Sequence, residues 1–375
     1  MQNHTQIEED KVEMEDGYIT NPFSTKDIKI TNQVLALPSL VSKLKYDEID
    51  LNPDFQRNEN LWSATQMSRL IESILLKLPL PIFYFDVSNP EKWIVVDGLQ
   101  RLSTIKRFMV DEKKPLRLKN LEFLTELNGK TYKDLDRGFQ RIIEGTQIVT
   151  YQIEAQTPKK VRYSIFNRIN TGGLRLNAQE IRQALNQQGK GVKFLKECTQ
   201  NEIFKRVVGV PSNRMLDREL ALRFIAFKLS PNSYINFNYN NMGEFLDESM
   251  EKLDSIQDSE RLEELKKMLL DTLEFSEDIF GQNHRFSRSF VNDNKTKTLN
   301  RSIFDVITVL FSEIDNKSLF LERKEIFLDR YKELLKDEKG EFSKAITEGT
   351  SGKNAIETRF RIIKKLIEEV MSVDR

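Results

Sequence analysis

Histidine is scarce in this chain of 375 residues, which contains only His4 and His284. A His-ligated metal cluster, a Ser-His-Asp triad and a nuclease of the His-Asn-His kind all need more histidine than this. Catalysis by this chain would therefore rest on Asp, Glu, Gln, Asn, Arg or Lys, with a hydrated Mg²⁺ where a metal takes part.

Cysteine, glycine, proline and long apolar runs are also limited. Cys198 is the only cysteine, which excludes a disulfide framework and fits a reducing cytosol. The 15 Gly and 10 Pro leave little material for long flexible linkers. No apolar run approaches the length of a membrane span, and the N-terminus lacks the apolar core of a signal peptide. We expect a cytoplasmic protein that does not contact a membrane.

The formal net charge is +0, but the two signs are unevenly distributed along the chain. Residues 159–228 contain 15 Lys or Arg against 5 Asp or Glu, whereas residues 244–280 contain 4 against 13. A basic face attracts polyanions such as nucleic acid, so segment 159–228 is a candidate DNA contact. Solvated helix faces would explain the same counts, and the counts alone favour that interpretation.

The hydrophobic pattern predicts an α+β protein with two domains. Residues 1–25 are polar and acidic without periodicity, which predicts a disordered tail. Residues 26–156 mix a helix capped by Ser63 and Gln66 with β-prone runs at 82–85, 93–96 and 147–153. From Thr157 onward nearly every segment has helical periodicity. We therefore expect a mixed α/β domain over 26–156 and an all-helical domain over 157–375.

The most informative motif spans residues 93–104. A buried strand ends in Asp97, turns on Gly98 and starts a helix whose first turn carries Gln100 and Arg101. Free N–H groups at a helix start, the helix dipole and an Arg side chain together form an anion site. Taken alone, the five residues 97–101 fit an ordinary turn better than a ligand site, because short motifs match often by chance.

Two further motifs accompany it. Residues 52–57 place Gln56 and Arg57 on a short connection before the first helix, where Arg57 could reach the same phosphate or pair with a surface carboxylate. Residues 166–180 carry Asn170-Thr171-Gly172-Gly173 between two helices, which is either a tight loop with exposed N–H groups or a glycine C-cap followed by the next N-cap.

In this order the motifs resemble the N-terminal domain of the GmrSD-type restriction endonucleases, a ParB/sulfiredoxin-like family marked by an Asp-Gly-Gln-Gln-Arg motif. The matching stretches are 55–57 with Trp62, 73–75, 79–82, 96–104, 166–184, 217–220, 222–224, 347–351 and 359–360. The resemblance covers roughly residues 30–370. It implies a ParB/sulfiredoxin-like fold for the mixed α/β domain, followed by the all-helical domain.

The resemblance implies a nucleotide-binding, NTP-hydrolysing component of a bacterial restriction or anti-phage defence system that acts on DNA. Matching residue types to that chemistry assigns catalysis to Asp97, Gln100 and Arg101, with Mg²⁺ held by Asp97 through water. The expected nucleotide- or phosphate-binding residues are Gln56, Arg57, Gly98, Ser103, Thr104, Asn167, Asn170, Thr171 and Gly172. The nucleotide is GTP or ATP. The expected partners are DNA, through segment 159–228, a separate nuclease subunit, and a second copy of the chain.

Two departures from the family pattern keep other functions open. The first Gln of the signature is Leu99 here, and the two histidines cannot supply the His-Asn-His nuclease domain that DNA-cutting members carry. One alternative is a ParB-like DNA-binding or scaffold protein without turnover, for which Leu99 argues. Another is a metal-dependent DNA phosphodiesterase, which would need several carboxylates around a metal.

Overall fold

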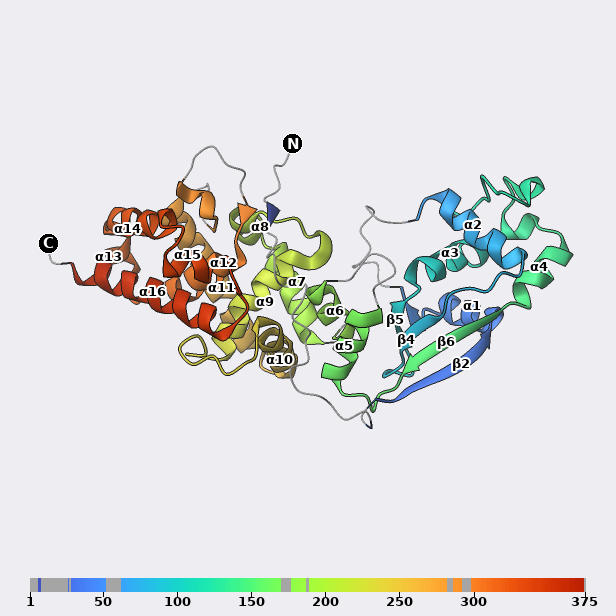
Figure 1. Ribbon diagram of the computed structural model, residues 1–375, viewed down its shortest axis with the longest axis horizontal. Helices are drawn as coiled ribbons and strands as arrows, with labels where there is room; N and C mark the ends of the chain where they lie inside the picture. Colours follow the sequence, from blue (N-terminus) through green and yellow to red (C-terminus); the bar gives the residue numbers. More distant parts are fainter. Residues whose placement is uncertain are drawn as a thin grey trace. The chain divides into compact units, whose positions relative to one another are not determined.

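The computed structural model describes residues 6–7, 26, 28–51, 62–169, 177–186, 189–281, 286–291 and 298–373. The chain divides into two compact units. The first comprises residues 21–177 and contains a five-stranded sheet with helices; the second comprises residues 178–375 with residues 1–20 and is helical (Figure 1). The predicted α+β class is confirmed.

The sheet of the first unit is mixed and has the strand order β2-β6-β4-β5-β3. Its strands are β2 (Ile30–Ala36), β3 (Ile49–Asp50), β4 (Phe83–Asp86), β5 (Trp93–Asp97) and β6 (Gln147–Ile153). β2 with β6 and β4 with β5 are antiparallel, whereas β4 with β6 and β3 with β5 are parallel. The three β-prone runs of the sequence are strands β4, β5 and β6.

Helices α1 (Leu37–Lys45), α2 (Ala64–Leu75), α3 (Leu99–Met109) and α4 (Arg137–Glu144) pack against one another and share one apolar core with the sheet. Two short 3₁₀ turns, Thr125–Leu127 and Tyr132–Asp134, precede α4. The capping box predicted for α2 is present, because Ser63 Oγ accepts from Gln66 N and Gln66 Oε1 accepts from Ser63 N. This cap sets the start of α2, and its apolar residues then face the core.

Alternation along β4 divides the sheet into an inner and an outer face. Phe83 and Phe85 are fully buried in the core shared with the helices, so Tyr84 and Asp86 belong to the outer face. Asp86 is buried there, because Arg162 Nη1 donates to its Oδ2 at 3.1 Å and Arg162 also donates to Ser88. Helix α5 (Lys159–Ile169), which carries Arg162, is thereby attached to the outer face.

This attachment accounts for a difference from the predicted organisation. The sequence places a boundary near residue 156, whereas the compact unit continues through α5 to Asn177. The tail predicted at 1–25 lies almost wholly outside the described residues. Within it, β1 (Gln6–Ile7) pairs in parallel with β7 (Thr298–Leu299) of the second unit, so that unit is helical except for one short ladder.

A buried carboxylate fixes the loop that crosses α2. Glu72 is 3% exposed and accepts backbone N–H bonds from Glu122, Phe123 and Leu124 at 3.0, 2.7 and 2.9 Å. Burial alone would raise the pKa of Glu72, but the three N–H donors and Arg69 outweigh burial, and the pKa lies below its usual value. Glu72 therefore stabilises the folded domain as a carboxylate.

The second unit contains thirteen α- or 3₁₀-helices among its described residues. They are α6 (Ala178–Leu185), α7 (Lys190–Gln200), α8 (Glu202–Val208), η4 (Asn213–Met215), α9 (Leu216–Leu229), α10 (Met242–Ser255), α11 (Ser259–Phe280), η5 (Arg288–Val291), α12 (Arg301–Phe311), α13 (Lys317–Glu322), α14 (Lys324–Lys336), α15 (Glu341–Ala345) and α16 (Lys353–Ser372). Helices α9 and α12 are buried on nearly every side, as central helices of a bundle are.

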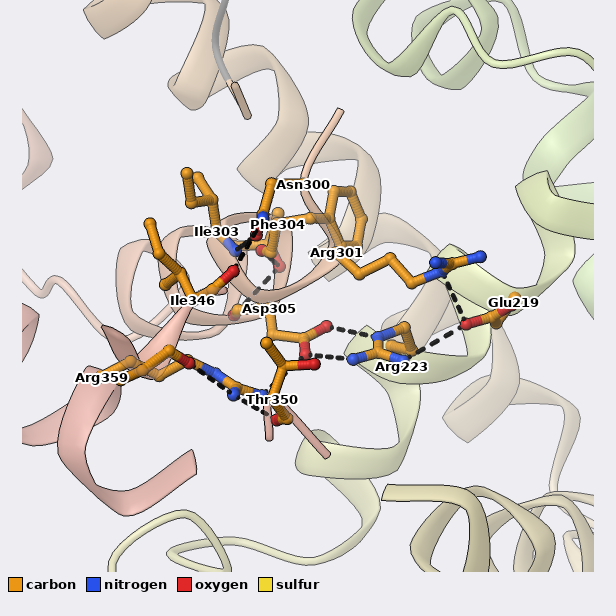
Figure 2. A network of polar contacts seen from close by, with 12 residues as sticks. Glu219, Arg223, Asn300, Arg301, Ile303, Phe304, Asp305, Ile346, Thr350 and Arg359 are labelled. Atoms are coloured by element: carbon orange, nitrogen blue, oxygen red, sulfur yellow. Dashed lines mark hydrogen bonds and ion pairs between the residues drawn. The ribbon is translucent and has the colours of Figure 1, made fainter. Parts of the chain in front are cut away.

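Because α9 and α12 are central, their charged residues are buried and have to be paired. Asp305 of α12 and Arg359 of α16 are both 0% exposed, and Arg223 of α9 is 3% exposed. Arg223 holds both Asp305 oxygens at 2.8 Å, and Arg359 Nη2 lies 3.3 Å from Asp305 Oδ2 (Figure 2). The network joins three helices that lie far apart in the sequence.

Glu219 extends the same network. Its Oε1 lies 3.2 Å from Arg223 Nη1 and 3.2 Å from Arg301 Nε (Figure 2). Burial would raise the pKa of Glu219, but Arg301 and Arg223 outweigh it and lower the pKa below the usual value. Several residues of the family-like segments 217–224 and 359–360 thus form the polar interior of the helical unit.

Replacing Glu72 by Gln should lower the free energy of unfolding by roughly 2 kcal/mol at pH 7, because an amide cannot accept all three N–H bonds. The folded pKa of Glu72 is lowered, so its contribution is complete above the unfolded value of about 4.3 and is lost as the pH falls through the folded value. Denaturant titrations at pH 7 and below pH 4 measure the difference, which should shrink in acid. Glu122→Gln, in the same loop but on an exposed side chain, is the control; equal losses in the two variants would contradict this role.

Asp305→Asn should destabilise the helical unit by about 3–5 kcal/mol, because Arg223 and Arg359 would remain buried without their carboxylate. Thermal and denaturant unfolding measure the loss. Glu369→Gln breaks the exposed pair with Arg330 and should change stability by less than about 0.5 kcal/mol. A small loss for Asp305→Asn would mean that the buried network does not stabilise the unit.

Candidate nucleotide site

The junction between β5 and α3 is formed by Gly98. Its φ of 100° is left-handed, and it is the N-cap of α3. A Cβ at this position would lie 2.5 Å from Phe83 Cδ1, closer than any real contact. The first helical hydrogen bond runs from Leu102 N to Gly98 O at 2.9 Å. The N–H groups of the three residues between them precede that bond and have no partner inside the helix. The residue type and the turn are those the sequence predicts.

Arg101 lies inside this junction. It is 8% exposed, its Nη2 donates to Asp97 Oδ2 at 2.9 Å and to Ile82 O at 3.1 Å, and its Nη1 donates to Pro81 O. Its guanidinium carbon lies 4.3 Å from the centre of the Phe83 ring. Burial lowers the pKa of Arg101, and Asp97 opposes that shift. Arg101 therefore joins β5 and α3 to the start of β4, where the sequence predicted a side chain that reaches phosphate.

Gln100 connects the junction to the segment before α2. Its Oε1 accepts from the backbone N–H of Trp62 at 3.2 Å. Trp62 is the first residue described after the stretch 52–61, which contains Gln56 and Arg57. Those two predicted ligands lie outside the described residues.

The other predicted residues of α3 differ in accessibility. Thr104 is 0% exposed and its Oγ1 donates to Gln100 O at 2.8 Å, so its hydroxyl satisfies the helix backbone and faces no ligand. Ser103 is partly exposed on the same helix. Leu99, the departure from the family signature, is partly buried against the core of the domain.

The third motif is largely outside the described part of the chain. Asn170, Thr171 and Gly172 belong to the stretch 170–176, which the structure does not describe. Asn167 lies within α5, but its side chain is outside the description. The structure thus brings together Asp97, Gly98, Gln100 and Arg101. The role of residues 170–176 in phosphate binding stays a prediction.

The basic segment 159–228 is largely neutralised by carboxylates. Its ion pairs include Arg162–Asp86, Arg182–Asp247, Lys205–Glu202, Arg206–Glu277, Arg214–Glu180, Arg223–Asp305 and Lys228–Glu313. Most of these carboxylates lie outside the segment, so the charge count within residues 159–228 does not include them. Arg168 and Lys193 are among the basic side chains that remain exposed.

Asp97 is the one carboxylate of the predicted site. Its side chain is 33% exposed beside Arg101. Among the described residues, no group of three His, Cys, Asp or Glu side chains is arranged to hold a metal ion. A single carboxylate fits Mg²⁺ that is held mainly by water and phosphate oxygens. In the described part of the chain, no helix has the length and hydropathy needed to cross a bilayer.

The contacts that sequence reasoning missed are those on the far side of Arg101. Its partners are Pro81 O and Ile82 O, just before β4, and the ring of Phe83, the first residue of β4, about twenty residues earlier in the chain. The alternation in 82–85 indicates that Phe83 is buried, but no sequence pattern pairs it with Arg101.

Gly98→Ala should destabilise the first domain by about 3 kcal/mol, because it adds a clash with Phe83 to an unfavourable positive φ. Gly129→Ala is the matched control: its φ is 84° and a Cβ would meet nothing within 4 Å, so it should cost only about 1 kcal/mol. Denaturant unfolding of both variants separates the two effects. Equal losses would show that Phe83 moves aside freely.

Residues 37–186 match the family model described as GmrSD restriction endonuclease, N-terminal domain. The match contains the sheet strands from β3 to β6, helices α1–α6 and the whole junction between β5 and α3. No curated protein matches the chain. The match covers less than half of the sequence and ends in the first helix of the second unit. Residues 37–186 are thus similar to the GmrSD restriction endonuclease N-terminal domain.

Proposed function

We propose that this chain binds a nucleoside triphosphate at the junction between β5 and α3 and hydrolyses it as a component of a restriction or anti-phage defence system. The observation that carries the proposal is the left-handed Gly98, which ends β5 at a carboxylate and starts α3, so that the N-terminus of the helix lies directly at the strand end. Such a helix start binds phosphate through its N–H groups and its dipole.

A phosphate bound at this junction would contact the backbone N–H groups of α3 rather than the guanidinium of Arg101. Arg101 has its guanidinium occupied by two carbonyls and Asp97, so its role is to position the strand end. Arg57 is the better candidate for a phosphate contact, because its segment reaches the domain at the hydrogen bond between Trp62 and Gln100. A guanidinium there would bind phosphate oxygens in a bidentate fashion.

Gln100 would orient the attacking water. It lies in the first turn of α3, and its Oε1 accepts a hydrogen bond from the backbone N–H of Trp62. In hydrolysis the water oxygen forms a bond to the γ-phosphorus while the bond from that phosphorus to the bridging oxygen breaks. The products are a nucleoside diphosphate and inorganic phosphate, and the water proton passes to the phosphate or to solvent. Orientation of this kind is the main contribution that a protein makes to phosphoryl transfer.

The negative charge of Asp97 would repel a bound triphosphate unless nearby cations neutralised that charge. Arg101 supplies one positive charge at 2.9 Å. We expect a Mg²⁺ that enters with the nucleotide, contacts Asp97 through water and neutralises charge on the phosphates. Ser103, partly exposed one turn into α3, is a further candidate for a water-mediated contact.

The remaining parts of the proposal concern partners. The family that residues 37–186 match is named for a restriction endonuclease, which supports a role in defence and a DNA target. DNA would contact the exposed basic side chains of segment 159–228, such as Arg168 and Lys193, because most of the others are paired. Cleavage would fall to a separate nuclease subunit, the two histidines being too few for a His-Asn-His centre. The loop residues Asn167, Asn170, Thr171 and Gly172 would complete the phosphate site.

Phosphate release from ATP, GTP, CTP and UTP, with and without DNA, tests the proposal. Asp97→Asn and Gln100→Ala should each reduce release by about 100-fold or more, while nucleotide binding falls much less. Asp111→Asn, an exposed carboxylate just beyond the other end of α3, should leave both unchanged.

Three outcomes are informative. Loss of release in the two site variants alone supports hydrolysis at this junction. Saturable binding without any release would instead favour the scaffold alternative for which Leu99 argues. Release that survives Asp97→Asn, or wild-type protein that binds none of the four nucleotides, would overturn the proposal.

A further inference from the structure

Three side chains form a row across the outer face of the sheet, and Asp97 of the proposed phosphate site adjoins the row at the end of β5. The strand register aligns Asp97 of β5 with Tyr84 of β4, Tyr84 with Tyr151 of β6, and Tyr151 with Asn32 of β2. Residues in register on neighbouring strands stand on the same face of a sheet. A bulge between Tyr84 and Phe85 brings Asp97 into line with Tyr84 although Val95 faces the core.

The two tyrosines form an aromatic surface within this row. Their ring centres are 5.4 Å apart and their planes differ by 15°. Both residues are partly exposed, and neither belongs to an apolar core of either unit. Among the described residues neither hydroxyl has a hydrogen-bond partner, and neither oxygen is buried. The pair therefore differs from a core pair, whose hydroxyls would be satisfied within the protein.

The neighbouring row shows that this exposure is particular to the tyrosines. One pair further along the strands, Ile153 is 0% exposed and Asp86 is buried beneath Arg162 of α5. The outer face is thus covered at Asp86 and open at Tyr84 and Tyr151. A rigid, partly open aromatic surface is suited to stacking on a flat ring, and every nucleobase has such a face.

The tyrosine pair lies close enough to the proposed phosphate site for one nucleotide to reach both. Neighbouring strands lie about 4.8 Å apart, so Tyr84 stands one spacing and Tyr151 about 10 Å from Asp97 along the row. A nucleotide whose phosphates lie at the start of α3 can place its base over strands β4 and β6. We propose that Tyr84 and Tyr151 are the stacking surface for the nucleobase of the bound nucleoside triphosphate, an inference that rests on the function proposed above.

Asn32 would add the only polar side chain beyond the stacked rings. It is exposed at the end of the row, where its amide carries both a donor and an acceptor for a base edge. Stacking itself is tolerant of base identity. The arrangement therefore predicts that ATP and GTP bind with similar affinity and that Asn32 contributes what preference there is.

Isothermal titration of the full-length protein with ATP, GTP, inorganic tripolyphosphate and a single-stranded oligodeoxynucleotide tests this assignment. Tyr84→Leu and Tyr151→Leu keep apolar bulk but remove the aromatic ring, and Tyr84→Phe and Tyr151→Phe keep the ring. The Leu variants should bind ATP and GTP roughly ten-fold more weakly, whereas the Phe variants should bind as the wild type does. Tripolyphosphate, which has no base, should bind all variants equally.

Tyr46→Leu is the control, because Tyr46 is an exposed tyrosine of the same domain that takes no part in the row. Unchanged ATP affinity in both Leu variants would overturn the inference, as would an equal loss for ATP and tripolyphosphate. Loss confined to the oligonucleotide would assign the rings to a base of DNA and equally overturn it. Failure of the wild type to bind any phosphate probe would instead remove the nucleotide site itself.

Discussion

The guanidinium of Arg101 is the contact on which the first domain's functional edge depends. It joins Asp97 at the end of β5 to the carbonyls of Pro81 and Ile82 before β4, and it lies over the Phe83 ring. Gly98 is confined by the same Phe83, because any larger residue would collide with it. The helix start is therefore held in place by a buried cation, and such preorganisation would let backbone N–H groups bind the proposed phosphate without first being ordered.

Several basic side chains of segment 159–228 are buried in ion pairs rather than exposed on the surface. The basic excess of segment 159–228 suggests a polyanion-binding face, yet Arg182 and Arg223 are almost fully buried on carboxylates of later helices. Buried guanidinium groups of this kind fix which helices pack together, since each needs a carboxylate partner. A polyanion therefore meets far fewer free cations than the sequence counts, and DNA contact would depend on a small number of exposed side chains.

Local features of the fold could be predicted from the sequence, and non-local ones could not. The capping box at Ser63 and the strands that end at Asp97 and Ile153 depend on nearby residues, so periodicity and capping rules identify them. Arg101 is predicted to contact phosphate from the sequence, and only the packed structure reveals its contacts with Pro81 O, Ile82 O and the Phe83 ring at the start of β4. Thr104 was predicted as a ligand because hydroxyls bind phosphate, whereas its place on the buried side of α3 makes it a helix back-bond. The phosphate contacts predicted for residues within 52–61 and 170–176 stay predictions, because these stretches lie outside the described part of the chain.

The structure changes the interpretation of Leu99. In the signature it stands where the family has a polar residue, and from sequence alone this argues for a site that has lost turnover. In the structure Leu99 packs against the core, while the residues on either side of it, Gly98 and Gln100, form the turn and its link to Trp62. An inward-facing side chain contributes packing and does not touch a ligand in front of the helix. The proposed chemistry therefore rests on Asp97, Gln100 and the backbone of α3, and Leu99 does not argue against it.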